Sequence, residues 1–346
     1  MTQTLRKHPA FRVGRRLPPG RCSPTLRASR RLLLCYDSVA MKHCWLVLFL
    51  AGLLPAAAQH TNTITFDELL QSAQDWAREN LDTNALQALA SGDPARQKQA
   101  VEDMQRQFQG EYVIDLAQLR GAANALLPLL EANEETRPYA AWLKTRLDCL
   151  DAADEIRLLV PPPKPEPGKP PPIPVPQPDL VREVWIRKVA TRPVPEESKP
   201  YVGRLKPIFA AQDVPSELVW IAETESSFDP RAESPVGAAG MFQLMPATAK
   251  RYGLKTWPFD QRYNPEDSAR ASAKYLSYLH GHFKDWRLAI AAYNAGEGTV
   301  QKLLDRQKAR TYDAIACHLP AETQMFVPKV EATLLRREGV RLEELP

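Results

Sequence analysis

The sequence predicts an all-α protein in which a proline-rich segment separates two groups of helices. Apolar residues recur at i, i+3, i+4 and i+7 in both halves, while the strict alternation typical of strands is scarce. Eleven of the eighteen residues in 161–178 are proline, which excludes helix and central strand there because each ring fixes φ and removes an N–H. We therefore expect a helical domain at 59–160, a linker at 161–179 and a second helical domain at 180–346.

Length and composition exclude several classes of protein. A chain of 346 residues allows two or three domains with substantial cores, and 25% charged with 44% hydrophobic residues excludes wholesale disorder. The net charge of +4 arises from residues 1–58, which hold ten Lys/Arg and one acid, so the remainder carries −5. A mildly acidic body disfavours nucleic acid as a partner.

Residues 41–58 have the pattern of a secretory signal peptide. A basic start precedes ten apolar residues at 45–54, and small residues follow at 56–58. The apolar run is too short to span a bilayer. We expect export to the periplasm or cell envelope, with residues 1–40 a misassigned start upstream of Met41. The alternative is a genuine basic extension ahead of an uncleaved anchor.

Cleavage after Ala58 would leave two cysteines, Cys149 and Cys317. Export permits a disulfide between them. Two cysteines in separate segments are more often buried thiols, and that is the interpretation favoured here. The absence of a C-x-x-C pair or a His cluster predicts no metal site.

The proline-rich segment predicts a semi-rigid polyproline II spacer, roughly 55 Å long; the alternative is a ligand for an SH3-like partner. Before it, residues 60–160 show a capping box at Thr65 and Glu68 and two helical stripes. The stripes are Phe66, Leu69, Leu70, Ala73, Trp76 and Ala77, then Leu116, Leu119, Ala122, Leu126, Leu127 and Leu130. This region carries no recognisable chemistry, and cell-wall or membrane-associated partners are the binding role we consider for it.

The second half places a glutamate on a core-facing stripe. Its helices begin with a stripe at Val181, Val184, Trp185 and Val189. A later helix opens at Val214–Glu217 and puts Glu225 on the face of Leu218, Ile221 and Ala222, with Glu223 pointing elsewhere. Removing a carboxyl from water raises its pKa, as a general acid near neutral pH requires. The alternative is a structural Glu paired with a buried Arg or a hydroxyl.

A glycine-containing loop follows this glutamate and leads into another helix at Pro246. Gly240, next to bulky Met241 and Phe242, indicates a close approach of two backbones. Gln243 could hydrogen-bond a polar ligand, with Met241 and Met245 as apolar walls.

Two further helices are predicted downstream, one after Asn264–Asp267 and one with a stripe at Trp286, Ala289, Ile290 and Tyr293. The second is closed by Asn294-Ala295-Gly296, so Tyr293 faces inward at a helix end. A buried phenol needs a hydrogen-bond partner. The candidates are a protonated glutamate and a backbone carbonyl.

The ordered motifs E-S-S-F-D-P, S-P-V-G-A-A-G-M-F-Q-L-M-P, N-P-E-D and A-A-Y-N-A-G-E-G resemble the transglycosylase SLT family, which cleaves peptidoglycan. The segment L-P-A-E-T-Q-M-F-V fits a final motif. The resemblance covers about residues 195–335 and is closest to the membrane-bound lytic transglycosylase D type. It departs from the common pattern at Phe242 and Phe326, and no LysM-type repeat follows.

This resemblance implies a lysozyme-like fold and a set of site residues. Glu225 would be the sole catalytic acid/base. The substrate-binding residues would be Ser234, Gln243, Met245, Tyr293, Asn294 and Glu322, with Tyr293 and Asn294 orienting Glu225. The nearest acids along the chain, Asp229 and Glu233, are interpreted as a turn cap and a solvated side chain.

The resemblance also implies a mechanism. Glu225 would protonate the bridge between N-acetylmuramic acid and N-acetylglucosamine, and the C6 hydroxyl of the sugar would close a 1,6-anhydro ring without water, metal or cofactor. One carboxylate would then suffice where most glycosidases use two. We expect a monomer acting on peptidoglycan strands. The alternatives are a hydrolysing, goose-type lysozyme and an inactive peptidoglycan-binding scaffold.

Overall fold

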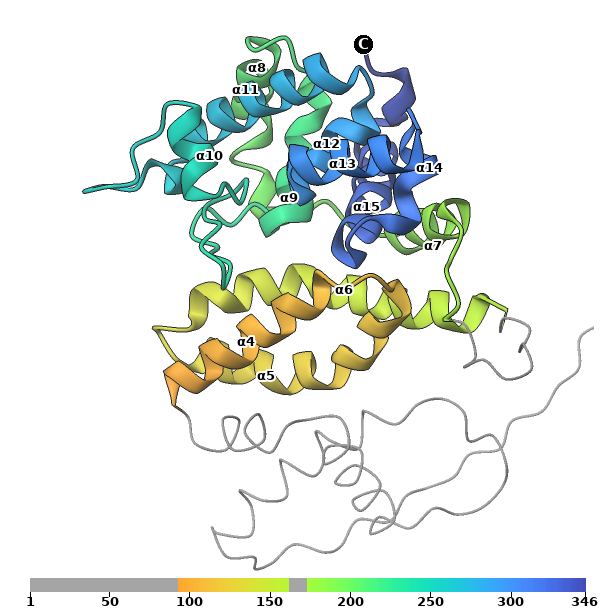
Figure 1. The fold of residues 1–346 in the computed structure, drawn as a ribbon. Coiled ribbons are helices and arrows are strands. Elements are labelled where there is room, and N and C mark those ends of the chain that lie inside the picture. Colours follow the sequence, from red (N-terminus) through yellow and green to blue (C-terminus); the bar gives the residue numbers. More distant parts are fainter. Residues whose placement is uncertain (1–92, 162–172) are drawn as a thin grey trace, which may run out of the picture. The chain divides into compact units, whose positions relative to one another are not determined.

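The computed structural model describes residues 93–161 and 173–346, and within these two ranges all regular structure is helical. Figure 1 labels the α-helices. The prediction of an all-α protein is confirmed. The signal sequence, the capping box at Thr65 and Glu68 and most of the proline-rich segment lie outside the described residues.

Within residues 93–161, three α-helices and one 3-10 helix are described. They are α4 (Pro94–Phe108), η2 (Val113–Leu119), α5 (Arg120–Ala132) and α6 (Arg137–Leu159). The side chain of Asp93 caps α4 by accepting a hydrogen bond from the Ala95 N–H, and Pro94 occupies the first turn, where its missing N–H costs nothing. The stripe at 116–130, predicted as one helix, is divided between η2 and α5.

After the proline-rich segment, the described chain continues as a series of helices and short 3-10 turns. The α-helices are α7 (Pro178–Ala190), α8 (Val202–Ala210), α9 (Ile221–Ser226), α10 (Pro246–Arg251), α11 (Pro265–Phe283), α12 (Trp286–Ala295), α13 (Glu297–Gln307), α14 (Tyr312–Ile315) and α15 (Ala321–Glu338). The 3-10 turns are η3 (Glu196–Ser198), η4 (Ser216–Trp220), η5 (Gln261–Tyr263), η6 (Ala316–His318) and η7 (Leu342–Glu344).

Side-chain caps fix the starts of the two helices that were predicted downstream of the loop. Asn264 accepts from the Asp267 N–H at the start of α11, and Asp285 accepts from the Leu288 N–H at the start of α12. Each bond satisfies one of the N–H groups that the first turn leaves without an intrahelical partner. The predicted helices after Asn264 and at Trp286 are therefore confirmed.

All described residues belong to one compact unit with two buried apolar clusters. The first cluster lies within α8 to α15 and the elements between them, and it includes Leu342 of η7. The second combines residues of α4, η2, α5 and α6 with residues from beyond the proline-rich segment: Val181, Val184, Trp185, Val189, Ala321, Met325 and Ala332. The domain boundaries stay predictions, but helices from both sides of the proline-rich segment share buried side chains.

One described stretch, Val113–Ala132, is long and apolar enough to cross a membrane by length and composition alone. Leu116, Leu119, Leu126 and Leu130 on this stretch are buried in the second cluster. Their burial explains the apolar composition by core packing.

Cys149 and Cys317 are both free thiols. Cys149 is buried, as expected, whereas Cys317 is partly exposed. The interpretation as two buried thiols therefore holds for Cys149 and is wrong for Cys317.

Candidate active site

The chain around Glu225 forms a short, fully buried helix. The expected single helix from residue 214 is in fact a 3-10 turn, η4, followed by the six-residue α9. It stops because Ser227 and Phe228 both adopt left-handed backbone angles, with φ of 54° and 64°. Phe228 then packs edge-on against Trp220, with ring centroids 5.5 Å apart. This turn leaves Glu225 in the last turn of a helix whose residues are all buried.

Glu225 is 4% exposed, and burial raises its pKa to about 8. The positive charge of Arg146 opposes this rise, and the negative charge of Glu322 adds to it. A carboxyl with this pKa is mostly protonated at pH 7, which is the state a general acid needs.

The alternative interpretation, a Glu paired with a buried Arg, is found in part. Arg146 of α6 places Nη2 4.0 Å from Glu225 Oε2, at the outer limit of an ion pair. The same nitrogen lies 2.8 Å from Glu322 Oε1, and Nη1 donates to the backbone carbonyl of Glu225 at 3.2 Å. The close ion pair of Arg146 is thus with Glu322, and Glu225 has the weaker contact.

Both carboxylate oxygens of Glu322 have hydrogen-bond partners. Oε1 accepts from Arg146, and Oε2 accepts from the side chains of Gln109 at 2.8 Å and Gln105 at 3.3 Å. Glu322 is 8% exposed. Arg146, Gln105 and Gln109 thus all donate to Glu322.

Glu223, two residues before Glu225, points away from it as expected but is just as buried. Its two oxygens accept a bidentate pair of bonds from Arg337 of α15, at 2.8 and 2.9 Å. This geometry is the strong form of a carboxylate–guanidinium pair.

The loop after α9 is held by its own backbone. Gly240, at φ 79°, approaches Arg262 so closely that a Cβ there would lie 1.9 Å from the Arg262 carbonyl oxygen, so the predicted close approach is confirmed. The Gln243 amide nitrogen donates to the carbonyls of Ala232 and Gly240. Its Oε1 is buried and has no hydrogen-bond partner among the residues that the structure describes. The hydroxyl of Ser234 accepts from the Ala238 N–H.

The Tyr293 hydroxyl bonds a backbone carbonyl, one of the two partners considered. It donates to the Phe242 carbonyl at 2.7 Å and lies 3.0 Å from the Ser272 hydroxyl. Burial, with the nearby Glu225 charge, raises the pKa of this phenol well above its usual value. Asn294 accepts from the hydroxyl of Thr323, next to Glu322 in α15. Tyr293 is therefore fixed against the loop and Asn294 against α15, and neither makes a direct hydrogen bond to Glu225.

The remaining predicted residues lie nearer the surface. Met245 is 43% exposed, whereas its supposed partner wall, Met241, is completely buried. Asp229 caps a turn by accepting from the Arg231 N–H, as predicted. Glu233 is partly exposed and accepts from the Tyr263 hydroxyl.

Three residues around Glu225 and Glu322 were missed from the sequence: Arg146, Gln105 and Gln109. They belong to α4, its C-terminal cap and α6, where no chemistry was recognised. Arg146 is buried on α6 among apolar neighbours, and its charge at that position is the one signal the sequence offered.

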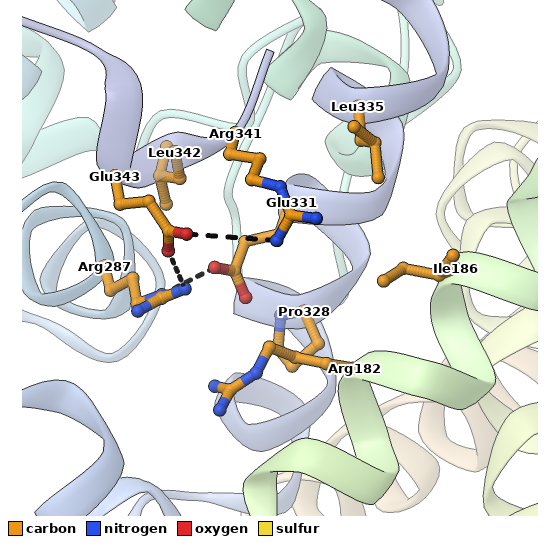
Figure 2. A pocket seen from close by; sticks show the side chains of 9 residues that line it. All are labelled: Arg182, Ile186, Arg287, Pro328, Glu331, Leu335, Arg341, Leu342 and Glu343. Atoms are coloured by element: carbon orange, nitrogen blue, oxygen red, sulfur yellow. Dashed lines mark hydrogen bonds and ion pairs between the residues drawn. The ribbon is translucent and has the colours of Figure 1, made fainter. Parts of the chain in front are cut away.

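A separate pocket lies between α7, α12, α15 and the C-terminal segment, and Figure 2 shows its lining. Arg287 pairs there with Glu331 and Glu343. None of the predicted site residues lines it. Within residues 93–161 and 173–346, no three His, Cys, Asp or Glu side chains come together as a metal site would require.

Part of this chain matches a known protein family. Residues 209–316 match the model of the transglycosylase SLT domain family. This stretch includes Glu225, Ser234, Gln243, Met245, Tyr293 and Asn294, and ends before Glu322.

Particular relatives extend the match. Membrane-bound lytic murein transglycosylase D of Escherichia coli (strain K12) is 38% identical over 154 residues, covering 42% of this chain and 34% of that protein. Soluble lytic murein transglycosylase of the same strain is 34% identical over 142 residues, 38% of this chain and 22% of that protein. Peptidoglycan transglycosylase gp16 of Escherichia phage T7 is 48% identical over 81 residues, 22% of this chain and 6% of that protein.

The chain thus spans about a third or less of the length of these relatives. Among solved structures, a complex of the 70-kDa soluble lytic transglycosylase with bulgecin A superposes with a TM-score of 0.37 at 19% identity, covering 86% of this chain and 70% of that one. The match that bears on function is therefore the sequence match around Glu225.

Proposed function

We propose that this protein is a peptidoglycan lytic transglycosylase in which Glu225 alone acts as acid and then base. The observation that carries the proposal is a buried carboxyl with its pKa raised to about 8, inside the stretch that matches the SLT family. The substrate class is taken from the relatives, whose names describe murein or peptidoglycan transglycosylases.

The proposed reaction begins with proton transfer from Glu225 to the glycosidic oxygen between N-acetylmuramic acid and N-acetylglucosamine. Positive charge develops at the anomeric carbon as the bond breaks. The ionised Glu225 then takes the proton from the C6 hydroxyl of the same sugar, whose oxygen bonds the anomeric carbon. The product is a 1,6-anhydromuramoyl end, and the carboxyl recovers its proton.

The surroundings of Glu322 support a single acid/base over a pair of catalytic carboxyls. Both of its oxygens are occupied by Arg146, Gln105 and Gln109. A carboxylate held in this way is a weak base and a weak nucleophile. This weighs against the hydrolysing alternative, in which a second carboxylate activates water or attacks the sugar.

Ser234, Gln243, Met245, Tyr293, Asn294 and Glu322 are proposed to position the glycan strand. The buried, unpartnered Oε1 of Gln243 is the clearest of these, because it is an acceptor that an amide N–H of an N-acetyl sugar would satisfy. We also propose that the lysozyme-like fold, the monomeric state and the location in the cell envelope follow from the same relationship.

The test is digestion of purified peptidoglycan with analysis of the products by mass spectrometry. Anhydro ends are one water lighter than the reducing ends left by a hydrolase. The Glu225→Gln variant should lose at least about 100-fold in rate, because the proton donor is gone. Glu233→Gln is the matched control, since it makes the same change at a partly exposed acid, and it should keep full activity.

Reducing ends in place of anhydro ends would replace the proposal with the lysozyme alternative. If the folded wild-type protein leaves purified peptidoglycan intact, the inactive scaffold would be favoured. Retained product release by Glu225→Gln would remove Glu225 from the chemistry.

A further inference from the structure

We propose that Arg146 of α6 is a positioning residue that, together with Glu322, sets the protonation state of Glu225. The inference rests on the proposed function for its consequence in catalysis. It deepens that function by giving a role in the reaction to a helix outside the matched stretch 209–316.

The geometry places one guanidinium between two carboxyls and on the backbone that carries the acid. Nη2 lies 2.8 Å from Glu322 Oε1 and 4.0 Å from Glu225 Oε2, and Nη1 donates to the Glu225 carbonyl. Nη1 also bonds the Thr145 hydroxyl at 2.7 Å, and the guanidinium carbon lies 5.1 Å from the centre of the Trp142 ring. The head of Arg146 is therefore held in place from several sides.

The charges explain why such an arrangement favours a neutral Glu225. The side chains of Arg146, Glu225 and Glu322 are 5–9% exposed, so an unbalanced charge among them would be costly. The ion pair of Arg146 with Glu322 already balances one positive charge with one negative charge. Ionising Glu225 as well would leave a net negative charge in a buried site. Three donors contact Glu322, whereas Glu225 has one distant contact with Arg146.

Other charged or titratable groups face this site and must be considered. Lys329 of α15 also acts on Glu225, but its Nζ is bonded to the Thr145 carbonyl and to Asp148. Asp148 is further paired with Arg192. The neutral groups are Tyr293, whose hydroxyl is bonded to the loop, and the thiol of Cys149. The charge of Lys329 is thus largely balanced locally, which leaves Arg146 and Glu322 as the pair that acts on Glu225.

Removing Glu322 and removing Arg146 should shift the pKa of Glu225 in opposite directions. In Glu322→Gln, the positive charge of Arg146 loses its partner and acts on Glu225, so the pKa of Glu225 falls. In Arg146→Met, the stabilising charge on the ionised form is lost, so the pKa rises. The double variant removes both influences and should lie near the wild type. A merely structural role for Arg146 predicts no such opposition.

The experiment measures anhydromuropeptide release from purified peptidoglycan between pH 4 and 10 for the full-length chain and its Glu322→Gln, Arg146→Met, Arg146→Lys and double variants. The high-pH limb of activity reports loss of the proton from Glu225. It should move to lower pH by about one unit or more in Glu322→Gln and to higher pH in Arg146→Met. One unit corresponds to about tenfold in rate at a fixed pH on that limb. Arg146→Lys keeps the charge and should stay within about half a unit of the wild type.

A second measurement does not depend on activity. The carboxyl carbon resonance of Glu225, identified by its loss in Glu225→Gln, gives its titration directly in each variant. Shifts in the same direction for Glu322→Gln and Arg146→Met, or no shift in either, would overturn the proposal. Opposed shifts in an inactive wild type would instead reject the proposed function and keep this inference. If Arg146→Met fails to fold, Glu322→Gln and Arg146→Lys still test the proposal. The pKa of Glu225 must fall in Glu322→Gln and must stay unchanged in Arg146→Lys.

Discussion

The two sides of α9 treat two buried glutamates in opposite ways. On one side, Glu223 receives two hydrogen bonds from Arg337, and both side chains are almost fully enclosed. On the other, Glu225 is equally enclosed, but its nearest cation is 4.0 Å away and bonded to another carboxylate. The comparison teaches that burial alone does not make a proton donor. The position of the nearest guanidinium distinguishes the two acids: Glu223 is closely paired with Arg337, and Glu225 has only a distant contact with Arg146.

Replacing each glutamate by glutamine gives the largest expected contrast. Glu223→Gln leaves the Arg337 guanidinium buried without its counter-charge, which should cost about 3–5 kcal/mol of unfolding free energy. Glu225→Gln replaces a mostly neutral carboxyl by a neutral amide of similar shape and removes the ionisation that favours the unfolded chain, so its unfolding free energy at pH 7 should equal or exceed that of the wild type. Urea unfolding of both variants measures the difference. Equal losses would show that the two environments do not differ as described.

The contribution of Glu225 to the unfolding free energy should also depend on pH, with a smaller effect for each pH unit than the Glu223→Gln substitution has. Because the pKa of Glu225 is raised to about 8 in the folded state, the folded protein binds more protons than the unfolded chain between about pH 4.5 and 8. The contribution of Glu225 to stability is therefore complete below pH 4.5 and is lost as the pH rises towards 8. The loss should reach at most about 1.4 kcal/mol for each pH unit.

Urea unfolding at several pH values, with Glu225→Gln as reference, isolates this contribution. The difference in unfolding free energy between wild type and variant should decline steadily across the window. A flat difference would show that Glu225 is ionised throughout.

The smallest expected effect concerns the turn that ends α9. Ser227 holds a left-handed conformation at φ 54° on the surface, and glycine adopts it without the Cβ penalty. Ser227→Gly should raise the unfolding free energy by about 0.5 kcal/mol and leave the reaction rate unchanged. Thermal unfolding and the product assay test this together. A lower rate would indicate that Ser227 serves the site as well as the turn.

The sequence predicted the helices of the second half well because their signals are local. The start of α11 is indicated by Asn264 before Pro265, and the buried face of α12 by the stripe from Trp286 to Tyr293. The helix before Glu225 was predicted too regular, because nothing local distinguishes a 3-10 turn at 216–220 from the first turns of an α-helix.

The sequence did not predict the contacts of the site that join residues far apart along the chain. Arg146 and Glu322 are separated by 176 positions, and no spacing rule connects them. The core-facing position of Glu225 predicted a buried Arg as one possible partner, but nothing local identified which Arg. Gln243 was predicted to hydrogen-bond a polar ligand, and this stays a prediction: its amide nitrogen donates to two carbonyls of its own loop, and its Oε1 has no partner among the described residues.

The second apolar cluster has a practical consequence for anyone who wishes to transplant the segment that carries Glu225. A fragment cut at the limits of the family match would retain Glu225 but discard α6, α7 and α15, and with them Arg146, Glu322 and Arg337. It would carry Glu223 without its counter-ion and leave the packing surface of α9 and α12 uncovered. The smallest portable unit is therefore larger than residues 209–316, and grafting experiments should begin upstream of α4.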